Sequence, residues 1–109
     1  MNTEELNIVE DVNIVERIKS LECDIDDSKR QIKSYQDKIS IYRSDLKANR
    51  HSYDDKMIDY IETQIRVLDD TIRYLEMRIE RTNEEIQRHI SSFILEQDYS
   101  WKYVKTKNQ

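Results

Sequence analysis

The sequence predicts an all-α fold in which two long helices form an antiparallel coiled-coil hairpin that dimerises into a four-helix bundle. Three observations support this prediction. The 109 residues include no Gly and no Pro, the residues on which tight turns between strands depend. Apolar residues recur at alternating spacings of three and four along two long segments. The two segments are out of phase, so the chain must turn between them.

The first helix is predicted over residues 13–48. Asn13 with Glu16 resembles a capping box at its start. Residues 1–12 form an acidic N-terminal segment with four acids and no base, and helical spacing of Leu6, Val9 and Val12 makes an extension of the helix through this segment the alternative. The seam of this helix, meaning the apolar row that faces its partner, is Ile14, Ile18, Leu21, Ile25, Ser28, Ile32, Tyr35, Ile39, Tyr42 and Leu46.

A turn over residues 49–52 and a second helix over 53–97 complete the predicted hairpin, which spans residues 13–98. Asn49 is the best available residue for a left-handed helix end, and Ser52 followed by two acids resembles an N-cap. The second seam is Ile58, Ile61, Ile65, Leu68, Ile72, Leu75, Ile79, Thr82, Ile86, His89 and Phe93. Residues 99–109 form an aromatic and basic C-terminal tail whose alternating pattern predicts a segment that is extended or disordered when alone.

Charges that flank the seams favour the antiparallel hairpin. Folding at the turn brings Arg43 to Glu62 on one flank and Arg17 to Glu85 on the other. A parallel homodimer of the first helix is the competing arrangement, and it sets Lys38 against Arg43. The hairpin is therefore preferred.

A second row of residues lies beside the seam of the second helix and contains no charge, although 38% of the chain is charged. We call this row the uncharged stripe; its members are Met57, Tyr60, Gln64, Val67, Thr71 and Tyr74. A helix with one neighbour should carry charges there, so the stripe predicts a second helical neighbour, either another copy or a different protein. The competing interpretation is an ordinary polar surface that happens to lack charge.

Two further surfaces suggest other partners. Carboxylates along the second helix, an acidic face formed by Asp54, Asp55, Asp59, Glu62, Asp69 and Asp70, could imitate a phosphate backbone, although solubilisation explains them as well. Tail contacts through Tyr99, Trp101, Lys102, Tyr103, Lys105 and Lys107 could stack bases and bind phosphates. Nucleic acid is thus a possible partner but is not favoured.

No catalytic, cofactor-binding or metal site is predicted. The single cysteine, Cys23, cannot form an internal disulfide, and no other His or Cys lies at ligand spacing from His89. Without a long apolar run, we expect no membrane association and a cytoplasmic protein. Abundant Ile, Lys, Asn, Tyr and Asp suggest an AT-rich genome, such as that of a low-GC bacterium, its phages or a large virus. For a viral protein the location would be the host cytoplasm.

These observations predict a non-enzymatic protein-protein interaction module: a coiled-coil scaffold, adaptor or small inhibitor, with a viral or phage accessory role as one setting. The first alternative is an acidic nucleic-acid mimic or regulator of a nucleic-acid enzyme. The second is nucleic-acid binding through the C-terminal tail.

Overall fold

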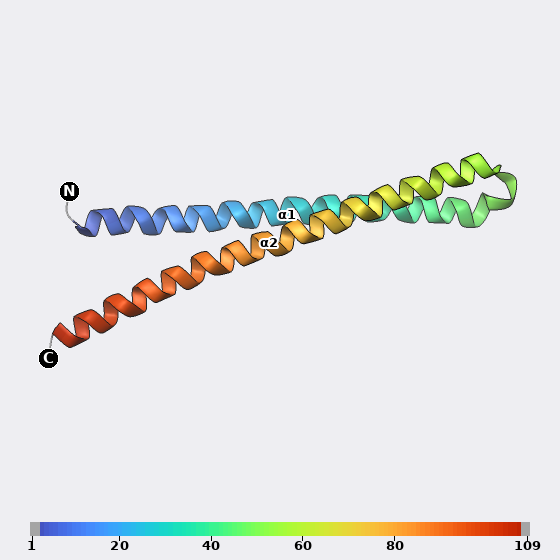
Figure 1. The fold of residues 1–109 in the computed structure, drawn as a ribbon. Helices are drawn as coiled ribbons and strands as arrows, with labels where there is room; N and C mark the ends of the chain where they lie inside the picture. Colours follow the sequence, from blue (N-terminus) through green and yellow to red (C-terminus); the bar gives the residue numbers. More distant parts are fainter. Residues whose placement is uncertain (1–2, 108–109) are drawn as a thin grey trace. The chain divides into compact units, whose positions relative to one another are not determined.

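The computed structural model describes the backbone of residues 3–107 and the side chains of residues 13–95. Helix α1 spans Thr3–Asn49, a short 3-10 turn spans Arg50–Ser52, and helix α2 spans Asp55–Lys107. Figure 1 shows the chain reversing direction at this turn. The all-α helical hairpin is therefore confirmed, and the described backbone contains no strand.

The chain divides into two compact units. The terminal unit combines Met1–Asp24 with Arg81–Gln109, and the turn unit is Ile25–Glu80. Each unit contains one segment of α1 and one of α2, so each has its own stretch of the seam.

Both predicted seams are the buried surfaces of their helices. Every seam residue from Ile14 to Phe93 is buried or half-buried. In the turn unit Ile61 retains 1% of its exposure and Ile39 5%, and in the terminal unit Leu21 retains 4%. Ser28 is the buried polar seam residue, and no fully buried side-chain nitrogen or oxygen among the described side chains lacks a hydrogen-bond partner. The heptad pattern therefore identified the core correctly, because one face of each helix is removed from water by the other.

The ends of the two helices differ from the sequence prediction. Helix α1 begins at Thr3, so Asn13 lies inside the helix and does not cap it. The alternative, in which the acidic segment extends the helix, is correct for the backbone from residue 3 onward. Helix α2 continues to Lys107, ten residues beyond the predicted end at 97, and the predicted extended tail is wrong for the backbone. No Gly or Pro interrupts this segment, so every residue can continue the helical hydrogen bonds.

The turn closes without a left-handed residue. Asn49 has φ −125° and ψ 4°, and no residue of the described backbone has a positive φ, so the predicted left-handed helix end is wrong. Instead the chain tightens into a 3-10 turn, and the Tyr53 amide donates to the Arg50 carbonyl oxygen at 3.3 Å. The side chains of Asn49 and Tyr53 both donate to Asp45 Oδ1, at 2.7 and 2.8 Å. The Asp45 carboxylate thus connects Asn49, at the end of α1, with Tyr53, which follows the 3-10 turn.

Asp54, and not the predicted Ser52, caps helix α2. The carboxylate of Asp54 accepts a hydrogen bond from the Met57 amide at 2.9 Å, and its carbonyl oxygen accepts from the Ile58 amide at 3.1 Å. These are the two bonds expected of an N-cap residue. Ser52 lies within the 3-10 turn and is too early in the chain to serve this role.

Candidate interaction surface

The uncharged stripe lies on the surface of the turn unit. Its four large members are exposed: Met57 by 40%, Tyr60 by 56%, Val67 by 54% and Tyr74 by 63%. Gln64 and Thr71 are half-buried, since their positions are adjacent to the seam. The stripe is therefore a row of solvent-exposed side chains on α2, as expected for a helix face that packs against a second helix.

Polar groups within the stripe do not oppose its burial. The Thr71 hydroxyl donates to the Val67 carbonyl oxygen at 2.8 Å. Its donor is satisfied inside the helix, so covering the stripe with another helix would leave no unpaired Thr71 proton. The two tyrosines carry apolar rings with one polar atom at the tip, a combination that is common in protein interfaces.

Helix α1 adds Ile41 to this surface. Unlike the stripe, Ile41 was not predicted from the sequence. Ile41 is 69% exposed, the highest value among the large apolar residues described. By its heptad position it lies on the same flank of the hairpin as the stripe, and it adjoins Tyr42, whose heptad partner across the seam, Ile65, lies between Gln64 and Val67. Ile41 lies two positions after Ile39 and immediately before Tyr42, so the only signal in the sequence was an isoleucine beside the seam and not on it. The stripe and Ile41 together form what we call the apolar patch.

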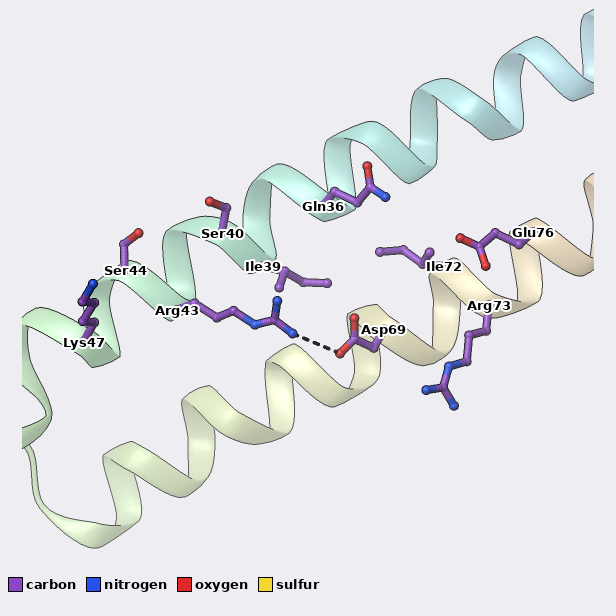
Figure 2. Close-up of a pocket in the computed structure, with 10 residues that line it drawn as sticks. All are labelled: Gln36, Ile39, Ser40, Arg43, Ser44, Lys47, Asp69, Ile72, Arg73 and Glu76. Carbon is purple, nitrogen blue, oxygen red and sulfur yellow. Dashed lines mark ion pairs between the residues drawn. The ribbon is translucent and has the colours of Figure 1, made fainter.

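The opposite flank of the turn unit is polar. Figure 2 shows an open groove between α1 and α2 with the cross-helix ion pair of Arg43 and Asp69 at 3.8 Å. Its lining residues are Gln36, Ile39, Ser40, Arg43, Ser44, Lys47, Asp69, Ile72, Arg73 and Glu76. Buried Ile39 and Ile72 belong to the seam beneath the charged rim. The groove contains neither His nor Cys.

One predicted cross-helix pair is present and another is replaced. Arg17 pairs with Glu85 at 3.0 Å in the terminal unit, as predicted. Arg43 reaches Asp69, one heptad beyond the predicted Glu62, and Glu62 pairs with Arg50 at 2.9 Å. A one-heptad change keeps the same flank, so the antiparallel arrangement is unaffected.

The six acids of the predicted acidic face do not form one free row. Asp54 caps α2, while Glu62 and Asp69 are paired with arginines. Asp55, Asp59 and Asp70 are exposed. Local structural roles thus account for three of the six acids. That the acidic face imitates nucleic acid stays a prediction from sequence.

The predicted tail contacts fall where the structure describes only the backbone. Tyr99, Trp101, Lys102, Tyr103, Lys105 and Lys107 lie on α2, and their side chains are outside the described residues. Binding of nucleic acid through this segment stays a prediction from sequence.

Titratable groups gather at Glu85 in the terminal unit. Glu85 accepts a hydrogen bond from Arg17, and His89 Nε2 lies 3.7 Å from the same carboxylate oxygen. The hydrogen bond from Arg17 lowers the pKa of Glu85, because it stabilises the charged carboxylate, and the neighbouring His89 acts in the same direction. Among the described side chains no group of three His, Cys, Asp or Glu could hold a metal ion, and Cys23 is an exposed free thiol.

The lowered pKa predicts a contribution to stability that is lost in acid. A carboxyl whose pKa is depressed in the folded state stabilises the fold above its unfolded pKa, about 4.5 or slightly lower, and this contribution disappears as the pH falls through the folded value. We expect Glu85→Gln to lower the urea midpoint at pH 6 and to leave it close to that of wild type near pH 3. Glu84→Gln, at an adjacent exposed carboxylate that forms no ion pair with the other described side chains, is the control. Equal effects of both substitutions at pH 6 would contradict the prediction.

We find no match of the chain to a protein-family model, to a curated protein or to a solved structure. No described helix contains an apolar stretch long enough to cross a membrane.

Proposed function

We propose that this chain is a protein-protein interaction module whose binding surface is the apolar patch. The observation that carries the proposal is the combination of exposure and lack of charge along one flank of α2. Val67 and Tyr74 remain more than half exposed, at 54% and 63%, although the seam residues of the same helix are covered. Apolar side chains in a continuous row gain free energy when a partner removes them from water.

The hairpin supports such a role because it holds the patch on a fixed scaffold. The seam between α1 and α2 is filled independently of the stripe, so the surface exists before the partner arrives. A preformed surface loses little conformational entropy on binding. A two-helix hairpin also buries a small core, so covering a second face adds stability.

The experiment compares immobilised wild-type chain with the variant Val67→Glu/Tyr74→Glu in extract of the cells that naturally produce the chain. Retained proteins, including other copies of the chain, are quantified by mass spectrometry. We expect the two glutamates to reduce retention of the specific partner by at least about tenfold, because an interface that must bury an unpaired carboxylate loses more than 1.4 kcal/mol. Helicity should be unchanged, since both positions are exposed.

The matched control is Ser40→Glu/Ser44→Glu, which adds the same charge to exposed positions at the polar groove. This control should retain the same proteins as wild type. The proposal is wrong if the stripe variant and the control retain the same proteins from the extract. It is also wrong if the wild-type chain retains no protein in greater amount than an unrelated immobilised helical protein does.

A further inference from the structure

We infer that the partner covering the apolar patch is a second copy of this chain, with the two α2 helices antiparallel and a two-fold axis between Gln64 and Val67. This inference rests on the proposed function and names the occupant of the same surface. Three features of the turn unit support it: the order of residues in the stripe, the charges beside the stripe, and the place of Ile41.

The spacing of the stripe reads the same in both directions, as an antiparallel self-contact requires. Reversing one copy places Met57 opposite Tyr74, Tyr60 opposite Thr71 and Gln64 opposite Val67, and each pairing occurs twice. Each tyrosine then faces a non-aromatic side chain of the other copy. A parallel pair would instead place Tyr60 on Tyr60 and Tyr74 on Tyr74, so the antiparallel pairing distributes side-chain volume more evenly.

The hairpin itself shows which flanking residues meet in an antiparallel pair. Heptad geometry assigns the buried Leu21 and Ile86 to one layer of the seam. Arg17 lies one turn before Leu21, Glu85 lies immediately before Ile86, and these two charged residues pair at 3.0 Å. The same relation can be applied to two copies of α2.

Applied to the layer of Tyr60 and Thr71, this relation brings Lys56, one turn before Tyr60, to Asp70, immediately before Thr71, of the second copy. The two-fold axis generates this attractive pair twice. Both residues are exposed, and neither takes part in an ion pair within the described part of the chain, so their charges are available. In the antiparallel arrangement, Lys56 and Asp70 at the edge of the stripe of one copy are therefore complementary in charge to Asp70 and Lys56 of the other copy.

Ile41 lies level with the proposed axis. It adjoins Tyr42, whose heptad partner across the seam, Ile65, lies at the axis, so the two-fold axis brings the Ile41 residues of the two copies to the same level. Its 69% exposure in the single chain is then explained by burial in the dimer.

A charge exchange tests this arrangement by sedimentation equilibrium. Wild type should have twice the mass of the chain, and Lys56→Asp or Asp70→Lys alone should raise the dimer Kd on the order of tenfold, because two attractive pairs become repulsive. An equimolar mixture of the two variants should recover the wild-type Kd, since every pair across the mixed dimer is again opposite in charge. Lys47→Asp, at an exposed position on the groove side, should leave the Kd unchanged.

Each other outcome overturns the inference. A monomeric wild type at chain concentrations of about 100 μM, far above the micromolar Kd of a modest interface, would exclude the second copy. A dimer that is insensitive to the single exchanges, or that the mixture does not restore, would exclude the antiparallel register. The proposed function fails separately, when Val67→Glu/Tyr74→Glu changes neither self-association nor the retention of other proteins.

Discussion

Replacing Ile61 by alanine is expected to lower the free energy of unfolding by about 2–5 kcal/mol. Ile61 is the most completely buried large side chain described, with 1% of its surface exposed, and it belongs to the seam of the turn unit close to the turn. Removing its outer carbons eliminates apolar burial and leaves a cavity that a two-helix seam can fill only in part. Urea denaturation followed by circular dichroism measures the change, at a chain concentration at which the association state is constant.

Ile94→Ala is the control for this substitution. Ile94 is on the same helix but is 51% exposed, so the same atoms are removed from a side chain that stays largely in water. We expect the control to change stability by about 0.5 kcal/mol or less. If the two variants lose a comparable free energy of unfolding, Ile61 is not more deeply buried than Ile94, and the packing described for the seam is wrong.

Replacing Leu21 by aspartate is expected to disrupt the seam of the terminal unit. Leu21 is 4% exposed, and a carboxylate in its place would be removed from water without a partner, at a cost of about 3 kcal/mol or more. Amide hydrogen exchange should accelerate in residues 13–24 and 81–95 more than in the turn unit, because local opening follows the packing that is lost.

Ser20→Asp introduces the same carboxylate one residue earlier, where the side chain is exposed. Exchange rates of this control should match those of wild type in both units. Uniform acceleration over the whole chain in Leu21→Asp would show that the hairpin opens as a single cooperative structure, contrary to the expectation.

Elements near the turn show why the local details were harder to predict than the fold. Ser52 and Asp54 both carry a side-chain oxygen that can accept a hydrogen bond from a helix N-terminus. The residue types alone therefore do not show which of the two caps the helix, and the path of the backbone decides it. The 3-10 turn places Asp54, not Ser52, at the position from which the Met57 amide is reached. Asn49 similarly avoids a left-handed conformation because its side chain is bound by Asp45 and the turn needs no positive φ.

Polar contacts across the hairpin followed only in part from the heptad pattern. Arg43 has both Glu62 and Asp69 on the flank that it faces, and the pattern of heptads assigns the flank but not the acid. Ile41 was missed because a single apolar residue off the seam carries no periodic signal. Its significance depends on the flank that it shares with the stripe, which is defined only when the two helices are paired.

The sequence by itself determined the two helices, both seams and the uncharged stripe, because the burial of a helix face follows from the spacing of residues along one chain. The tertiary structure alone decided the cap of α2, the partners of Arg43 and Glu62, and the addition of Ile41 to the apolar patch. The cap depends on the path of the chain through the 3-10 turn, and the other features depend on which side chains of α1 and of the turn come close to α2. Many choices of rotamer and pairing satisfy the same heptad pattern, and packing selects among them.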